Sequence, residues 1–208
     1  MTPSGARKRR GRPEFTRENA LAVAADLFRE RGYRATSLQE VADVFGVQRP
    51  ALYYHFKNKA ELLVEIHTRL LTELTQDLEE IAALDVPPET KLARLFEDQV
   101  RVYAENIAGL AVLLQNQEEL PADVRKPVQE EIRRYGGLLE GIVREGIEAG
   151  ALADDLDPKM VVLALSGMTG WMYRWYDPAG AWGPDEIADV FIRLAENGML
   201  ADGPARRG

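Results

Sequence analysis

The sequence predicts an all-α protein of about nine helices, and three observations support this fold class. Apolar residues recur at three- and four-residue spacing along most of the chain, which is the period of a helix with one buried face. Proline and glycine separate these segments, and no stretch alternates apolar and polar residues convincingly as a half-buried strand does. The 208 residues are 46% hydrophobic, enough for a core in one large or two small domains.

Three short helices are expected near the N-terminus. The first covers residues 16–31. Ser37 caps the second, and Glu40, three residues later, completes a capping box. Gly46 marks a tight turn, and the third helix covers residues 48–55.

Six further helices are expected downstream, and proline or glycine residues fall between most of them. Asp157 and Pro158, for example, suit the N-cap and the first position of a helix. The expected ranges are 59–83, 89–106, 109–117, 122–150, 158–176 and 184–197.

Charge is divided unevenly along the chain. The net charge is −8, but residues 1–59 hold 12 Lys+Arg and 6 Asp+Glu, whereas residues 60–208 hold 14 and 28. A basic N-terminal module on an acidic body predicts a polyanionic partner for the first part only. The alternative is a basic tail on an ordinary acidic protein, because five of the twelve basic residues are Arg7, Lys8, Arg9, Arg10 and Arg12.

Several classes of function are disfavoured by the composition. The chain has no cysteine and only two histidines, so we expect no disulfide, no metal site and no cofactor. We find no nucleophile paired with a base, no paired carboxylates and no phosphate-binding glycine loop, so we expect no catalytic residues and no enzyme. The N-terminus lacks the apolar region of a signal peptide, and no apolar run approaches ~18 residues, so we expect a cytoplasmic protein without membrane contact.

Residues 36–59, TSLQEVADVFGVQRPALYYHFKNK, are the most distinctive segment and predict a helix, a tight turn and a second helix. Leu52 and Phe56 lie four residues apart, so both can point into the core. The remaining faces of this short helix carry Arg49, Pro50, Tyr53 and Tyr54.

Two exposed tyrosines on so short a helix indicate a binding partner, because leaving large aromatic side chains in water is unfavourable. Insertion of the helix into the major groove of DNA would provide one. Arg49 can then pair with guanine O6 and N7, while Pro50 and Ala51 can pack on thymine methyl groups. Alternatively, Tyr53 lies partly in the core and Tyr54 packs on the first helix.

Residues around this helix are expected to contact the DNA backbone through hydroxyl groups, amides and positive charge. His55 has the alternative of being an ordinary surface histidine. The full expected DNA-binding set is Thr36, Ser37, Gln48, Arg49, Pro50, Ala51, Tyr53, Tyr54, His55, Lys57 and Lys59.

Residues 17–63 resemble the DNA-binding domain of the tetracycline-repressor (TetR) family of bacterial regulators. The resemblance implies that Arg49 reads bases, that Pro50 makes apolar base contacts, and that the tyrosines, His55, Lys59 and the threonine before the second helix hold the backbone. It rests on the AADLF segment of the first helix, Gly32-Tyr33, Thr36-Ser37, Val41-Ala42, Gly46-Val47 and, above all, LYYHFKNKAEL at residues 52–62.

Two positions depart from the family pattern. Gln48 stands where many members have a serine, which predicts a weaker N-cap for the third helix. Ala51 replaces a common threonine or serine, which removes one hydroxyl contact.

The resemblance also implies a division of the chain and a use for its larger part. We expect a basic disordered arm (1–13), a helix-turn-helix domain (14–58), a ligand-binding and dimerisation domain (59–200) and a disordered tail (201–208). Two-fold DNA sites require a dimer. The expected dimer interface is Gly167, Gly170, Ile187, Val190, Phe191 and Leu194, with an intramolecular core as the alternative for the stripe from Ile187 to Leu194.

Residues 167–180, GMTGWMYRWYDPAG, are similar to a segment of family members that regulate fatty-acid or sterol breakdown and sense acyl-CoA thioesters. An apolar cavity would suit an acyl tail, and Arg174 would suit a phosphate or carboxylate. Arg174 has the alternative of bridging acids at the dimer interface. The expected ligand-binding set is Phe96, Tyr103, Leu113, Tyr135, Trp171, Arg174 and Trp175.

These features together predict a homodimeric transcriptional regulator, most plainly a repressor, which binds a two-fold operator and is released by a small apolar or acyl-CoA-type effector. The alternative is a DNA-binding regulator without a small-molecule ligand, controlled by a protein partner or by its own level.

Overall fold

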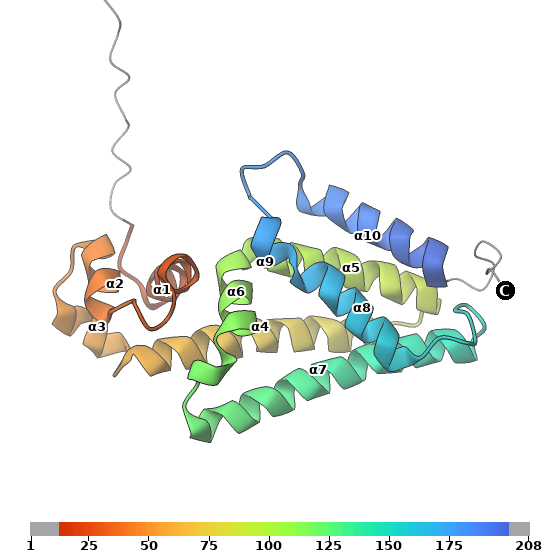
Figure 1. Ribbon diagram of the computed structural model, residues 1–208, viewed down its shortest axis with the longest axis horizontal. Helices are drawn as coiled ribbons and strands as arrows, with labels where there is room; N and C mark the ends of the chain where they lie inside the picture. The colour runs from red at the N-terminus through yellow and green to blue at the C-terminus, as the bar shows by residue number, and fades with distance from the viewer. Residues whose placement is uncertain (1–12, 200–208) are drawn as a thin grey trace, which may run out of the picture.

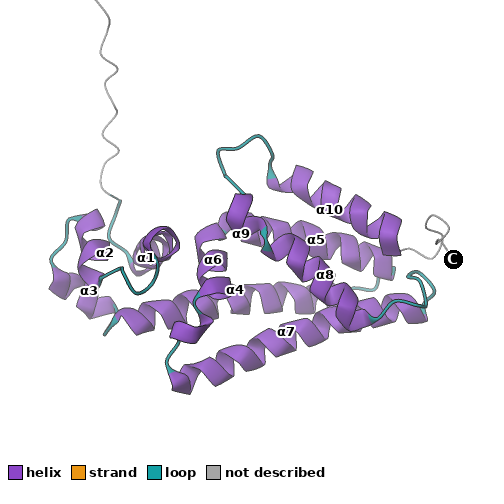
Figure 2. Ribbon diagram, viewed as in Figure 1, coloured by secondary structure: helices purple, strands orange, loops and turns teal. Residues whose placement is uncertain are grey.

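The computed structural model describes residues 13–199, and for residues 198 and 199 it describes the backbone alone. The expected arm and tail therefore lie almost wholly outside the described residues. All regular structure in the described part is helical, which confirms the all-α prediction (Figures 1 and 2). The elements are α1 (Arg17–Arg31), α2 (Leu38–Phe45), α3 (Arg49–His55), α4 (Lys59–Ala82), α5 (Pro88–Glu105), α6 (Ile107–Gln115), the 3-10 helix η1 (Gln117–Glu119), α7 (Ala122–Glu148), α8 (Pro158–Gly170), α9 (Met172–Trp175) and α10 (Pro184–Met199).

The first three helices form a small bundle whose ends are fixed by local chemistry. Thr16 caps α1 by accepting a hydrogen bond from the backbone of Asn19. Gly32 ends that helix with φ of 86°, a conformation that favours glycine. The capping box predicted for Ser37 and Glu40 is present at the start of α2.

The helix α4 joins this bundle to the rest of the molecule without interruption. Leu62, Leu63 and Ile66 of its first turns belong to the same buried cluster as residues of α1, α2 and α3. Leu78 and Ile81, near its other end, belong to a second buried cluster with residues of α5, α7 and α8. The domain boundary at residue 58 stays a prediction, since one helix supplies both clusters.

The larger part of the chain packs around α4 and α5. Figure 1 shows α7 running along α4, with α8 and α10 on the outer side. Helix α5 contacts α4, α7, α8 and α10, which makes it the central element of this part. No helix among residues 13–199 is long and apolar enough to cross a membrane.

Two helix boundaries differ from the sequence-based expectation. The helix expected to begin at Gly109 begins two residues earlier, at Ile107. Gly109 therefore lies inside α6, where it faces Leu70 and Ile66 of α4. The helix expected to run to residue 176 ends at Gly170, and the chain bends at Trp171 before α9. The bend buries Met172 completely and leaves Trp171 exposed.

Candidate nucleic-acid interface and ligand site

The turn between α2 and α3 sets the direction of the second helix. Gly46 has φ of 67° and caps α2, and the amide of Val47 donates to the carbonyl of Ala42. Ser37 Oγ accepts from the amide of Glu40 at 3.3 Å, and the Glu40 carboxylate accepts from the amide of Ser37 at 2.7 Å. The bonds that the carboxylate accepts from the amide and the hydroxyl of Ser37 lower the pKa of Glu40, so the carboxylate is charged and the box is formed at neutral pH.

Helix α3 presents one apolar face inward and a polar, aromatic face outward. Leu52 and Phe56 are fully buried, as their spacing predicts. Tyr54 is 88% exposed and Tyr53 is 39% exposed. The Arg49 guanidinium donates to the Tyr53 hydroxyl at 2.6 Å and lies 5.1 Å from the centre of its ring. The seven-residue helix α3 therefore presents a cationic and aromatic surface to solvent, in which Arg49 is fixed against Tyr53.

The other predicted contact residues of this region divide into outward and inward groups. Gln48, Pro50, Ser37 and Lys57 are exposed, while Ala51 is half-buried. Gln48 makes no side-chain cap bond, in line with the weaker cap expected there.

His55 is half-buried, and its ring packs edge-on against Phe15 at 5.3 Å and Tyr54 at 5.2 Å between ring centres. Its carbonyl accepts a hydrogen bond from Arg17 at 2.7 Å, and Arg17 is ion-paired with Glu65 of α4. These contacts join α1, α3 and α4 beneath the outward face.

The expectation for Thr36 is corrected by its burial. Its side chain is 2% exposed, and its hydroxyl donates to the carbonyl of Gly32 at 3.0 Å and lies 3.3 Å from that of Leu27. The hydroxyl is therefore committed to the loop between α1 and α2, because its one proton already has a partner there.

Lys59 also points inward instead of into solvent. Its Nζ donates to the carbonyls of Tyr33 at 2.7 Å, Thr36 at 2.8 Å and Arg34 at 3.3 Å. The ammonium lies 4.3 Å from the centre of the Tyr33 ring, and burial lowers the pKa of Lys59. The first turn of α4 is thus tied to the loop between α1 and α2, which sequence spacing alone did not indicate.

The predicted ligand-binding residues fall into two groups in space. Phe96, Tyr103 and Leu113 are buried, and Tyr135 is half-buried against the core. Trp171 is 57% exposed, and Trp175 and Arg174 are exposed as well, so these three lie apart from the buried group and their role in ligand binding stays a prediction. Trp171 continues the exposed face of α8 that carries Leu163 and Gly167.

The interior also contains polar groups that the sequence did not single out, beside two predicted tyrosines. Gln99 of α5 donates to the hydroxyl of the predicted Tyr135, and burial raises the pKa of both Tyr103 and Tyr135. Two side chains of α4 are also buried: Thr75 Oγ1 and His67 Nε2 have no hydrogen-bond partner among the described residues. A void of about 10 Å³ lies beside Phe96 and Gln99. In the sequence these polar residues occupy positions that helical spacing assigns to the buried face. They could have been found in this way, but polar residues also occupy the adjacent positions, so the buried ones do not stand out.

The predicted interface residues also divide. Gly167, Val190 and Leu194 are exposed, whereas Ile187 is buried and Phe191 half-buried against the core. Gly170 faces Leu114 of the same chain. Other exposed apolar residues on α8 were missed, although their helical spacing was visible in the sequence; these are Met160, Leu163 and Ala164.

Comparison with known proteins agrees with this architecture. Residues 20–66 match the family described as bacterial regulatory proteins, tetR family, and residues 85–199 match the tetracyclin repressor-like C-terminal domain. The chain is 28% identical over 203 residues to the HTH-type transcriptional repressor KstR2 of Rhodococcus jostii strain RHA1, covering 97% of this chain and 98% of the relative.

Two solved structures are similar throughout. The ketosteroid transcriptional regulator KstR2 of Mycobacterium tuberculosis has a TM-score of 0.84 and 25% identity, covering 91% of this chain and 97% of that chain. AibR, solved in complex with isovaleryl coenzyme A and operator DNA, has a TM-score of 0.74, covering 86% of this chain and 96% of that chain. Its 23% identity makes that likeness one of fold alone. The family and these relatives are transcriptional regulators rather than enzymes. Because both its helix-turn-helix module and its C-terminal domain match, the chain belongs to the TetR family of bacterial transcriptional regulators.

Proposed function

We propose that this regulator is a repressor that binds a two-fold DNA operator as a homodimer and is released by a small apolar or acyl-CoA-type effector. The outward face of α3 carries this proposal: Arg49 is exposed and hydrogen-bonded to Tyr53, and Tyr54 is 88% exposed beside His55. A helix with this surface fits the major groove, where bases can be distinguished by their hydrogen-bonding groups.

Different residues of the helix-turn-helix domain would then contact the bases and the DNA backbone. Arg49 would read guanine, and Pro50 with Ala51 would contact thymine methyl groups. Ser37, Gln48, Tyr53, Tyr54, His55 and Lys57 would contact the backbone. Thr36 and Lys59 would act indirectly, by fixing the loop between α1 and α2.

Dimerisation would use the outer faces of α8 and α10. Met160, Leu163, Gly167 and Trp171 follow one another at three- and four-residue spacing on the exposed face of α8. Val190 and Leu194 do the same on α10. Contiguous apolar surface of this kind marks an interaction site, and a second copy of the chain would cover it.

This interface can be tested by sedimentation of the purified protein. Leu163→Glu should give monomers, because a carboxylate would be buried in an apolar contact. Gln129→Glu, which adds the same charge on the exposed side of α7, should remain dimeric. A dimeric Leu163→Glu variant would rule out the α8 face.

Effector binding would involve the interior around α5. Tyr103, Tyr135 and Gln99 offer neutral hydrogen-bonding groups among Phe96 and other apolar side chains. The void there holds only about 10 Å³, so an acyl-type effector would have to stabilise an opened state. Such a shift in helix packing would change the spacing of the two α3 helices and weaken operator binding.

The small void also favours the second candidate, a DNA-binding regulator without a small-molecule ligand. The two are separated by a DNA-shift assay with a series of acyl-CoA thioesters, supported by thermal-shift measurements on the free protein. Release of operator DNA by a thioester supports the effector proposal. Unchanged DNA binding and unchanged Tm across the series favour the second candidate.

A further inference from the structure

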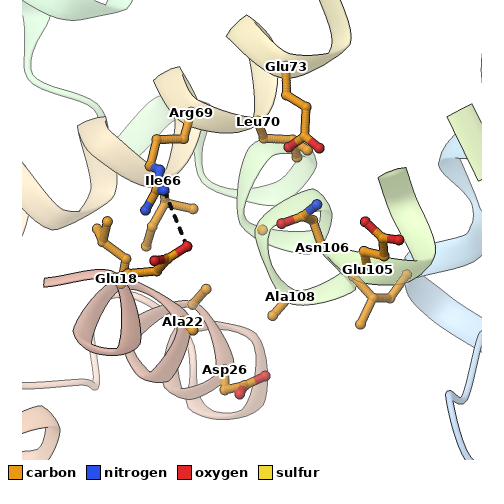
Figure 3. A pocket seen from close by; sticks show the side chains of 14 residues that line it. Glu18, Ala22, Asp26, Ile66, Arg69, Leu70, Glu73, Glu105, Asn106 and Ala108 are labelled. Atoms are coloured by element: carbon orange, nitrogen blue, oxygen red, sulfur yellow. Dashed lines mark ion pairs between the residues drawn. The ribbon is translucent and has the colours of Figure 1, made fainter. Parts of the chain in front are cut away.

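A cleft of about 480 Å³ lies where α1, α4 and α6 meet, at the junction of the two parts of the molecule (Figure 3). Its apolar lining comes from Leu21, Ile66, Leu70 and Ile107, with small residues such as Ala22 along the edge. The charged lining consists of Glu18, Asp26, Glu73, Glu105 and Arg69. The cleft therefore combines an apolar floor with four carboxylates and a single guanidinium.

These carboxylates are only weakly neutralised by the protein itself. Glu18 meets Arg69 at 3.6 Å, and Asp26 and Glu105 each have one arginine at 3.7 Å. Glu73 has no lysine or arginine nitrogen within 4.0 Å among the described residues. Burial raises the pKa of both Asp26 and Glu73, and this effect exceeds the opposing effect of Arg29 on Asp26 and of Arg101 on Glu73.

The chain itself supplies a segment of complementary chemistry next to this cleft. Residues 1–12 contain five basic residues and no acidic residue, and only the short link from Pro13 to Arg17 separates them from Glu18. Twelve extended residues reach about 40 Å, whereas the cleft edge from Glu18 to Asp26 extends about 12 Å along α1. The tether is long enough to place several basic side chains in the cleft, and it raises their local concentration.

We propose that residues 7–12 of this chain dock in the cleft between α1, α4 and α6 when DNA is absent, and leave it when the protein binds DNA. The cleft carboxylates and the DNA phosphates then compete for the same arginine and lysine side chains. Docking would reduce the apparent DNA affinity in proportion to the fraction of the protein whose arm remains free, so a larger docked fraction weakens binding more. A docked fraction of about one half to nine tenths gives a twofold to tenfold effect.

Docking can be observed directly without DNA or effector, so its outcome is independent of the proposed effector and operator. The protein has no cysteine, so a dye on Ala6→Cys labels the arm alone. Time-resolved fluorescence anisotropy should show the dye rotating with the whole protein, and Glu73→Gln with Glu105→Gln should restore fast rotation. Glu80→Gln with Glu148→Gln, which removes two exposed charges elsewhere, should leave the slow rotation intact. Fast rotation in the unmodified protein would overturn the proposal.

A mutant cycle tests the competition. In the full chain, Glu73→Gln with Glu105→Gln should tighten binding to any DNA duplex by about twofold to tenfold. The same pair should have no such effect when Arg7, Lys8, Arg9, Arg10 and Arg12 are all replaced by glutamine. Equal tightening with and without the basic arm would mean only that the protein had lost negative charge, and would overturn the competition.

Discussion

Replacing Lys59 by methionine should destabilise the fold while leaving the electrostatic part of DNA binding intact. The lysine ammonium donates to two backbone carbonyls at 2.7 and 2.8 Å and to a third at 3.3 Å. Methionine keeps the apolar stem and removes the charged donor, so the change removes these bonds together with the contact between the ammonium and the Tyr33 ring.

The magnitude follows from the two short bonds. A hydrogen bond that involves a charged group contributes about 1.5–3 kcal/mol, and the lower end applies because water can reach this half-buried site. The expected loss is therefore about 3 kcal/mol in the free energy of unfolding. For a chain of this size, that corresponds to a fall in Tm of roughly 6–12 °C.

Lys57 provides the matched control, because it is exposed and lies two residues earlier. Lys57→Met should leave Tm unchanged and flatten the dependence of DNA affinity on salt by about one unit per subunit. Lys59→Met should lower Tm and keep the salt dependence. Urea unfolding at one protein concentration and DNA titrations at several salt concentrations measure both quantities. If Lys59→Met left Tm unchanged and flattened the salt dependence, Lys59 would not hold the loop between α1 and α2. It would instead contact a DNA phosphate, as the family resemblance implies.

Three further outcomes are expected. Arg49→Ala should cost about 1–3 kcal/mol on operator DNA and relax the preference at one base pair, which competition with operator variants measures; an equal loss on random DNA would contradict base reading. Burial lowers the pKa of His67, so protonation of this side chain opposes folding. The free energy of unfolding should therefore fall as pH drops below about 6.5, by up to ~1.4 kcal/mol per pH unit. Urea unfolding of the protein and of His67→Gln at several pH values measures the difference. A Cβ on Gly146 would lie 2.7 Å from Leu152, so Gly146→Ala should destabilise by about 1–3 kcal/mol. Gly141→Ala, with no heavy atom within 4 Å, should instead stabilise the helix by about 0.5–1 kcal/mol, and the opposite ranking in thermal unfolding would show that the close approach is not real.

The sequence was sufficient for the fold class and for much of the helix-turn-helix domain. The capping box at Ser37 and Glu40, the turn at Gly46 and the inward side chains of Leu52 and Phe56 all depend on local spacing. Local spacing is a property of the chain itself, so periodicity and cap residues predict it well.

The inward direction of Lys59 was not predictable in the same way. A lysine at the first position of a helix is normally a solvated charge, and its partners here belong to a loop more than twenty residues earlier. Thr36 is a similar case, since its burial depends on the packing of that loop against α1.

The placement of the aromatic segment was beyond sequence reasoning for a different reason. Trp171, Arg174 and Trp175 follow α8 in one continuous apolar pattern, and that pattern is compatible with either a buried or an exposed face. The bend that buries Met172 decides between the two, and it arises from contact between α9 and α6, which are distant in sequence.

The unbroken course of α4 has a mechanical consequence. Its 24 residues make a rod of about 36 Å that is held in both buried clusters. A tilt of only about 5° about the far end would displace its first turn by about 3 Å, which becomes about 6 Å when two subunits move apart symmetrically. Successive major grooves on one face of DNA are spaced by about 34 Å, so this displacement is a sizeable mismatch between the two recognition helices. In the proposed dimer, a small angular change deep in the molecule would be amplified into a lateral movement of several ångströms between the two recognition helices.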